Sequence, residues 1–259
     1  PDVLEFITAK RTPGRWNNFN VSVGIIDAFM TALKTDSEWE LVHAAVPSQD
    51  LIASGAYQHS DGRWVYSKID ARTLWDTIMK STYDFAEPGV LFLDNINRDN
   101  NLRYCEEIRA TNPCGEQPLP DYGCCDLGPI ILTRFVKNPF GFGGQPEFDY
   151  DEFAKAVALQ VRALDNVLDI TFWPLQEQRD ESASKRRIGV GFTGLGNTLA
   201  MLKLDYRSIE ALDTATFIAR TMRDTAYKAS VALAEEKGAF PKFDSKKYLK
   251  TGTFASRLP

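Results

Sequence analysis

The sequence predicts an α/β fold, because two kinds of segment alternate along its 259 residues. Long stretches carry apolar residues at helical spacing, and short apolar or alternating runs have the period of a strand. Turns that contain glycine or proline separate them. A hydrophobic share of 44% and a charged share of 25% are typical of a globular protein, and a chain of this length buries a large core in one or two domains.

Five helices are predicted from apolar residues that recur every three or four positions. They cover residues 1–11, a segment beginning at Asp27, and residues 70–86, 150–170 and 208–237. Their expected buried faces include Phe29 and Leu33; Leu74, Ile78, Met79 and Tyr83; Phe153, Val157, Val161, Leu164 and Leu168; and Leu212, Ala219, Met222, Ala226 and Leu233. Gly238 is a fitting C-cap for the last helix.

Four strands are predicted, at residues 19–23, 39–42, 90–93 and 130–136. The run at 90–93 is wholly apolar, which suits a strand covered on both faces in a parallel sheet. The polar run 94–101 then follows the carboxyl end of that strand as a loop, either a ligand site or a structured turn.

Three shorter patterns are expected to be connections or packing sites. The Asp-Gly pair within residues 59–62 predicts a hairpin turn, with His59 as a solvated loop residue. Residues 141–146 are rich in glycine but lack the Gly-Lys-Ser/Thr of a phosphate-binding loop, which indicates a connector. Residues 189–194 match GxGxxG, but the charged residues 182–187 before them do not read as a buried strand, which favours small residues that let helices pack closely.

Composition excludes several classes of function. The net charge of −5 gives no basic footprint for nucleic acid. No apolar run approaches the ~20 residues that cross a membrane, and no signal peptide opens the chain. Four cysteines in so long a chain do not make a disulfide scaffold, which predicts a reducing, cytoplasmic location.

The strongest chemical signal is the segment Asn112-Pro113-Cys114-Gly115-Glu116, followed by Cys125. Proline and glycine around Cys114 disfavour a helix and predict a loop. The loop offers a thiol between an amide and a carboxylate, which are a hydrogen-bonding group and a proton acceptor.

Four interpretations of Cys114 follow. The first is a buried structural thiol, since free cysteine is often buried. The second is a metal ligand together with Cys105, Cys124 and Cys125. The third is a nucleophile paired with a distant histidine, and the fourth is a centre of one-electron or redox chemistry. The absence of a CxxC pair disfavours the metal site, so no metal is predicted. The only histidines, His43 and His59, are far away in sequence, which ranks the hydrolytic pairing low.

The Asn-x-Cys-x-Glu motif with a second cysteine eleven residues on resembles the catalytic subunit of ribonucleotide reductase. The wider pattern looks most like the adenosylcobalamin-dependent, class II branch. Matching segments occur in the family's order at residues 2–7, 19–23, 86–90, 97–102, 112–120, 132–136 and 185–189. The resemblance implies that residues 1–259 are an internal portion of the catalytic barrel domain of a longer polypeptide, part of a ten-stranded α/β barrel with Cys114 on a central finger loop.

The resemblance also implies roles for the motif. Cys114 would become the thiyl radical that takes the ribose 3′-hydrogen, and Glu116 would accept the 3′-hydroxyl proton. Asn112 would hydrogen-bond the ribose hydroxyls, and the backbone from Asn112 through Pro113 and Gly115 to Glu116 would line the substrate. Cys125 would be one half of the reducing cysteine pair. Cys124, where the family has a small residue, is expected to serve packing. The family usually has Ser and Asn where this chain has Pro129 and Ile131, which puts the local hydrogen bonding after Cys125 in doubt.

The expected cofactor is adenosylcobalamin. The expected partners are a ribonucleoside di- or triphosphate, a dithiol reductant such as thioredoxin, and a second copy in a homodimer, with no nucleic acid or membrane. The partner of Cys125 and the main phosphate-binding loop would lie outside this chain, so the chain alone is expected to be inactive. Three alternatives stay open: a class I-type subunit activated by a separate radical-generating subunit, a non-radical cysteine-dependent enzyme, and a non-catalytic assembly domain.

Overall fold

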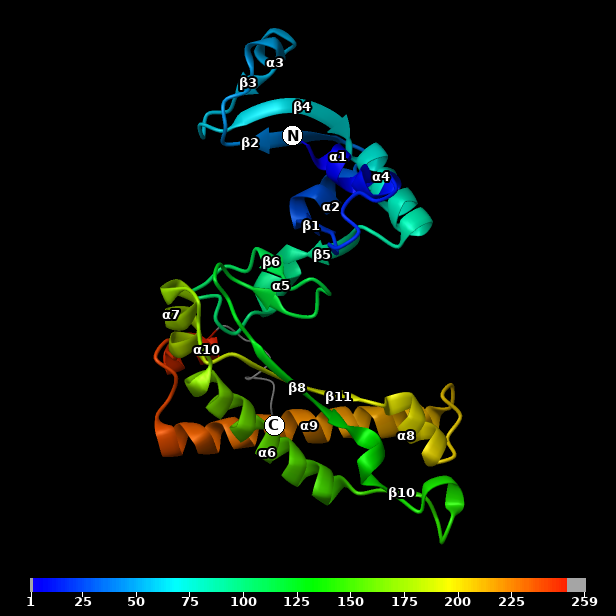
Figure 1. Ribbon diagram of the computed structural model, residues 1–259. Coiled ribbons are helices and arrows are strands. Elements are labelled where there is room, and N and C mark those ends of the chain that lie inside the picture. The colour runs from blue at the N-terminus through cyan, green and yellow to red at the C-terminus, as the bar shows by residue number, and fades with distance from the viewer. Residues whose placement is uncertain (1, 251–259) are drawn as a thin grey trace. The chain divides into compact units, whose positions relative to one another are not determined.

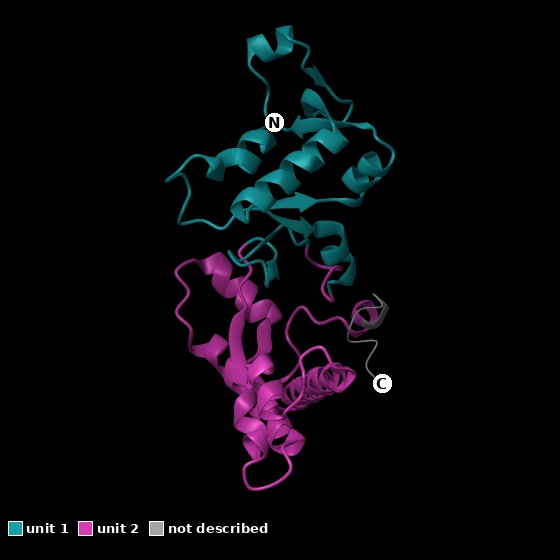
Figure 2. Ribbon diagram, turned by 90° about the vertical axis from the view of Figure 1, so that its right-hand side faces the viewer, with its two compact units in different colours: residues 1–100, 107–121 teal, residues 101–106, 122–259 magenta. Residues whose placement is uncertain are grey.

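The computed structural model describes residues 2–250, and the chain divides into two compact units (Figure 2). Unit 1 takes the chain up to residue 100 together with residues 107–121. Unit 2 takes residues 101–106 and the chain from residue 122 onward.

Unit 1 is a mixed α/β unit with three small sheets (Figure 1). Strands β1 and β5 pair in parallel, β2, β4 and β3 form an antiparallel sheet in that order, and β6 and β7 form a hairpin. The elements in chain order are α1 (Val3–Thr8), the 3₁₀ turn η1 (Ala9–Arg11), β1 (Ser22–Ile25), α2 (Asp27–Lys34), β2 (Glu38–His43), α3 (Gln49–Ala53), β3 (Tyr57–Gln58), β4 (Trp64–Asp70), α4 (Ala71–Phe85), β5 (Gly89–Phe92), α5 (Leu93–Asp99), β6 (Ala110–Thr111) and β7 (Pro118–Leu119).

The core of unit 1 forms where α1, α2 and α4 meet strand β1. Its buried members are Ile7, Ile25, Phe29, Leu33, Ala71, Leu74 and Ile78. The Asp70 carboxylate caps α4 by accepting the Thr73 N–H at 2.8 Å, and Ala86 ends the helix in the left-handed conformation. These caps explain why the predicted helix at 70–86 has the bounds that the structure shows.

Unit 2 is built on one parallel strand pair and two long helices (Figure 1). Strand β8 pairs with β11, and helix α6 packs against both strands and against α9. The elements are β8 (Asp126–Ile131), η2 (Leu132–Phe135), β9 (Val136–Lys137), η3 (Pro139–Gly141), β10 (Glu147–Phe148), α6 (Tyr150–Ile170), α7 (Gln176–Lys185), β11 (Ile188–Thr193), α8 (Leu195–Met201), α9 (Ile209–Lys237) and α10 (Ser245–Lys250).

The core of unit 2 is filled by one face of α6. Phe153 and Val157 are fully buried there with Leu132 and Ile218. Gly128 lets α6 approach β8, because a Cβ at this position would lie 1.7 Å from the Gln160 amide nitrogen. The predicted α6 face, Phe153 to Leu168 at helical spacing, is confirmed.

Other predictions are also confirmed. Of the helix predicted at 1–11, the described residues form α1 and η1 over Val3–Arg11, and the structure also contains the predicted helices from Asp27, at 70–86 and at 208–237, and the strand at 39–42. The turn around Asp61-Gly62 joins antiparallel strands, and residues 141–146 form a connection. The mixed α/β class is as predicted.

Two predicted strands lie elsewhere. Strand β1 begins at Ser22 and not at Phe19, because the Val21 N–H donates to the Glu87 carboxylate at 3.0 Å. The strand predicted at 130–136 is wrong in its bounds: β8 ends at Ile131, and the chain then turns through η2, which buries Leu132 completely.

The strand predicted at 90–93 is confirmed as β5, which pairs in parallel with β1, although Phe92 at its end is 41% exposed and so is not covered. The predicted loop at 94–101 is wrong, because helix α5 occupies Leu93–Asp99. The Asn97 side chain holds this polar helix in place by donating to the Leu93 and Ile108 carbonyls and accepting the Ile108 N–H. The helix propensities of residues 93–99 do not predict a tertiary contact of this kind.

The remaining corrections concern individual side chains and one short segment. Tyr83 is 91% exposed and Leu212 66% exposed, and Ala219 is also exposed, because the helical stripes turn away from the core at these positions. Residues 189–193 lie in strand β11, against which helix α6 packs, and Gly194 is the N-cap of α8. His59 is not simply solvated: its Nε2 lies 2.7 Å from the Glu40 carboxylate.

Within residues 2–250, no helix combines the length and apolar character that a membrane span needs. The same residues bring together no group of three or more His, Cys, Asp or Glu side chains suited to a metal ion.

Truncating Phe153 to alanine should lower the free energy of unfolding by about 3–5 kcal/mol, since its fully buried ring packs edge-on against Phe135 and Phe148. Urea denaturation followed by far-UV circular dichroism measures the loss. Leu159→Ala, on the same helix at 68% exposure, is the control and should change stability by less than about 0.5 kcal/mol. Equal losses in both variants would contradict this packing.

Candidate active site

The motif segment forms the tip of the β6–β7 hairpin in unit 1. Residues 112–117 connect Thr111 to Pro118, and Cys114 and Glu116 are both exposed on this turn. Gly115 has φ +86°, a conformation that favours glycine. The prediction that Cys114 lies on a loop is confirmed, and the interpretation as a buried structural thiol is wrong.

Asn112 closes the turn with both its backbone and its side chain. Its N–H donates to the Gln117 carbonyl at 3.2 Å, and its Oδ1 accepts the Gln117 N–H at 2.9 Å. Its carbonyl accepts the Gly115 N–H at 3.1 Å and the Thr111 hydroxyl at 2.9 Å. The side-chain oxygen is therefore occupied by the loop itself, and the Nδ2 amide is the atom suited to donate to a ligand.

The Cys114 sulfur has a polar neighbour from a distant part of the sequence. The Asn20 amide nitrogen lies 3.9 Å from Cys114 Sγ, in the range of a weak N–H···S hydrogen bond. Asn20 sits on the segment before β1, and that segment is anchored. The Glu87 carboxylate accepts the Val21 N–H and the Lys10 ammonium group, and Lys10 also donates to the Phe19 carbonyl. Burial alone would raise the pKa of Glu87, but these donors lower it, so the anchor is ionised at neutral pH.

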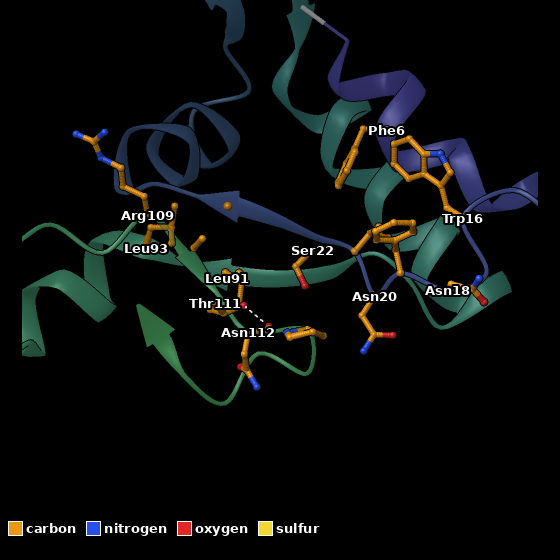
Figure 3. Close-up of a pocket in the computed structure, with 15 residues that line it drawn as sticks. Phe6, Trp16, Asn18, Asn20, Ser22, Leu91, Leu93, Arg109, Thr111 and Asn112 are labelled. Carbon is orange, nitrogen blue, oxygen red and sulfur yellow. Dashed lines mark hydrogen bonds between the residues drawn. The ribbon is translucent and has the colours of Figure 1, made fainter. Parts of the chain in front are cut away.

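A cavity of about 640 Å³ adjoins the hairpin (Figure 3). Its lining includes Asn112 and Pro113 of the turn, Asn20 before β1, Ser22 at the start of β1, and Arg109 before β6. In Figure 3 the aromatic rings of Phe6 and Trp16 lie at one end and Arg109 lies at the other. This volume is within the range of small-molecule sites, and the lining offers apolar, hydroxyl, amide and cationic groups.

Both histidines are engaged on the antiparallel sheet of unit 1. His59 Nε2 contacts Glu40, and His43 Nδ1 accepts the Ala45 N–H at 2.9 Å. The Cys114 sulfur is met by Asn20 instead, which disfavours a cysteine–histidine nucleophile.

Cys125 belongs to unit 2 and stands directly before β8. It is half-buried, and burial raises the pKa of its thiol to about 11, an effect that the Arg187 charge partly offsets. Cys125 therefore keeps its proton at neutral pH. Cys124 beside it is half-buried with its pKa also raised by burial, and its sulfur contacts the Tyr122 carbonyl at 3.3 Å.

These features define an α/β protein with one exposed thiol on an internally hydrogen-bonded hairpin and a second, protonated thiol directly before strand β8. The comparison with known families gives the class. Residues 1–257 match the family model "Ribonucleotide reductase, barrel domain", and the chain belongs to this family.

Individual relatives agree. The chain is 34% identical over 253 residues to the vitamin B12-dependent ribonucleoside-diphosphate reductase of Thermoplasma acidophilum, covering 97% of this chain and 30% of the relative. It is 35% identical to the protein of the same name from Mycobacterium tuberculosis, covering 97% and 33%. The ribonucleoside-diphosphate reductase large subunit of Caenorhabditis elegans is 27% identical, with 94% and 32% covered. The chain thus spans about a third of the length of these curated relatives.

Sequence reasoning missed Asn20 as part of the site. Its segment was expected to be a strand, and nothing in local pattern ties it to Cys114, ninety-four residues away. The only sequence signal was that residues 19–23 match a family segment.

Replacing Asn112 with alanine should speed amide exchange at Gln117 roughly fivefold, because a hydrogen bond worth about 1 kcal/mol is lost. Asn112→Asp retains the accepting oxygen and should keep the protection. Hydrogen–deuterium exchange with mass spectrometry on the hairpin peptide measures both. Unchanged exchange in the alanine variant would show that Asn112 does not hold the turn.

Proposed function

We propose that the intact protein containing this chain reduces ribonucleotides to 2′-deoxyribonucleotides by radical chemistry at Cys114. The observation that carries the proposal is the exposed Cys114 thiol at the tip of a hairpin that Asn112 closes, beside a cavity of about 640 Å³. Membership of the ribonucleotide reductase barrel family supports it.

The first step is removal of a hydrogen atom from the ribose. The oxidised Cys114 sulfur takes the 3′-hydrogen, and Glu116, two residues away on the same turn, accepts the 3′-hydroxyl proton. Loss of that proton from the carbon radical makes expulsion of the 2′-hydroxyl as water easier. A turn closed by hydrogen bonds favours both transfers because they require contact between the reacting atoms. The Asn112 Nδ2 amide is suited to donate to a ribose hydroxyl.

The second step supplies two electrons and two hydrogens. Cys125 and a partner cysteine outside this chain each give up a hydrogen and become a disulfide, which replaces the C2′–OH bond with C2′–H and releases water. Cys114 then returns its hydrogen to C3′, and Glu116 returns the proton to the 3′-oxygen. The raised pKa of Cys125 suits this role, since the thiol and not the thiolate carries the hydrogen. An external dithiol such as thioredoxin would reduce the disulfide.

Adenosylcobalamin is the proposed initiator and would supply the radical that oxidises Cys114. The relatives named as vitamin B12-dependent are more similar to this chain than the large subunit from Caenorhabditis elegans, which favours cobalamin over a separate radical-generating subunit. The residues described here do not by themselves fit the corrin: the cavity at the hairpin is of nucleotide size, and both histidines are engaged on the distant β2–β4–β3 sheet.

The intact protein carrying Cys114→Ser should form no measurable deoxynucleotide, because a hydroxyl does not replace the thiol in hydrogen-atom transfer. Cys105→Ser, which removes another exposed thiol, is the matched control and should keep near-normal turnover. Product formation is measured anaerobically by chromatography. Turnover by the Cys114 variant would reject the proposal, and loss of activity in a His43 and His59 double variant would favour hydrolytic chemistry.

Cys125→Ser should abolish multiple turnover with a dithiol reductant, while Cys124→Ser should retain it. The two residues are adjacent and both half-buried, so they differ mainly in role. Turnover that survives loss of Cys125 but not of Cys124 would reverse the assignment. The chain of residues 1–259 assayed alone should give no product.

A further inference from the structure

Strand β11 places Arg187 opposite Cys125. Ile188 pairs with Asp126 in the parallel β8–β11 ladder, so the residues one position earlier, Arg187 and Cys125, also lie across from each other. The Asp126 N–H donates to the Arg187 carbonyl at 3.4 Å, which continues the ladder to this point. Neighbouring strands lie about 4.8 Å apart.

The two side chains share one face of the strand pair. Side chains alternate along a strand, so Arg187 shares its face with Gly189, and Cys125 shares its face with Leu127. A Cβ added to Gly189 would lie 3.5 Å from Cys125 Sγ and 2.0 Å from a Leu127 methyl group. The Cys125 sulfur therefore lies over β11, on the face to which Arg187 belongs.

A cluster of carboxylates fixes the Arg187 guanidinium. Its Nη2 donates to Glu106 Oε1 at 2.6 Å, and its Nη1 lies 3.6 Å from Glu181 Oε1. Lys185 binds both carboxylates, at 2.7 Å and 2.6 Å. The Glu106 side chain is 2% exposed and that of Lys185 is 7% exposed, so the arrangement is held in a dry environment.

The cluster does not saturate Arg187. Its Nη1 is buried, yet among residues 2–250 it has no hydrogen-bond partner. Burial raises the pKa of both neighbouring thiols, and the Arg187 charge acts against burial on Cys125 and on Cys124. The other charged or titratable groups that face these thiols are Asp126 and Glu181.

We infer that Arg187 is a positioning residue for the Cys125 sulfur, and that its guanidinium stabilises the thiolate which Cys125 becomes when its disulfide is reduced. The existence of that disulfide rests on the proposed function. In the step, a thiolate of the external dithiol bonds to the partner sulfur, the bond from that sulfur to Cys125 breaks, and the electron pair stays on Cys125 Sγ, which then takes a proton from solvent. The second thiol of the dithiol releases the partner cysteine, so the dithiol is oxidised as the pair is reduced. A stabilised leaving thiolate departs faster.

The test is the alkylation rate of Cys125 in the reduced intact protein, measured with iodoacetamide at pH 9 and assigned to each cysteine by tandem mass spectrometry. Arg187→Gln should slow the reaction of Cys125 roughly three- to tenfold, because the reagent attacks the thiolate. Glu106→Gln should speed it, since the same cluster loses a negative charge. Each variant replaces one charged partner of the same hydrogen bond with a neutral amide, so a purely structural effect would move the two rates in one direction.

Arg186→Gln is the matched control. This neighbouring guanidinium is paired with Asp165 at 2.8 Å and Asp169 at 2.6 Å, and its loss should leave the Cys125 rate unchanged. An unchanged or faster rate in Arg187→Gln, or equal slowing in Arg186→Gln, would overturn the inference. If circular dichroism shows that Arg187→Gln is unfolded, two other variants test the inference. The alkylation rate of Cys125 must then be faster than wild type in Glu106→Gln and close to wild type in Arg187→Lys. Alkylation needs no turnover, so its outcome is separate from that of the proposed function.

Discussion

The hydrogen bond from the Gln117 N–H to the Asn112 side chain is the interaction on which the site depends. It closes a six-residue turn between two very short strands, which have little pairing of their own to hold the loop in shape. The closed turn presents Cys114 and Glu116 together at an exposed tip. The Asn112 side-chain oxygen is therefore used by the turn itself, and in the proposed function its amide nitrogen donates to the substrate.

The two thiols have opposite surroundings, and each environment fits its proposed chemistry. Cys114 is exposed next to Asn112 and Pro113, which line the cavity, and in the proposed function its sulfur contacts a substrate carbon. Cys125 is half-buried before a parallel strand, and burial keeps its proton in place. The positive charge of Arg187, which Glu106 holds in place, partly offsets the effect of burial on the pKa of the Cys125 thiol. In the proposed function, the exposed thiol contacts the substrate and the half-buried thiol supplies hydrogen.

Much of this fold was predictable from the sequence where one local signal was dominant. The apolar stripe from Phe153 to Leu168 gave helix α6 its observed bounds, and the Asp61-Gly62 pair marked the hairpin turn. Proline and glycine around Cys114 placed it on a loop. The predictions failed where tertiary contacts decided the outcome: Asn97 stabilises a polar helix through Ile108, and Glu87 delays the start of β1 by binding Val21. Two further relationships join distant segments: Asn20 contacts Cys114, and Arg187 lies across from Cys125. No periodic pattern in the sequence predicts either of them.

The central claim is that the Cys114 sulfur removes the hydrogen from C3′ of a ribonucleotide. A competition between ordinary and 3′-deuterated ribonucleotide, in the intact protein with adenosylcobalamin and a dithiol, tests it most directly. The account predicts that the ordinary substrate is consumed faster and that the unreacted pool becomes enriched in deuterium. Equal consumption of the two substrates, with deoxynucleotide still formed, would contradict it.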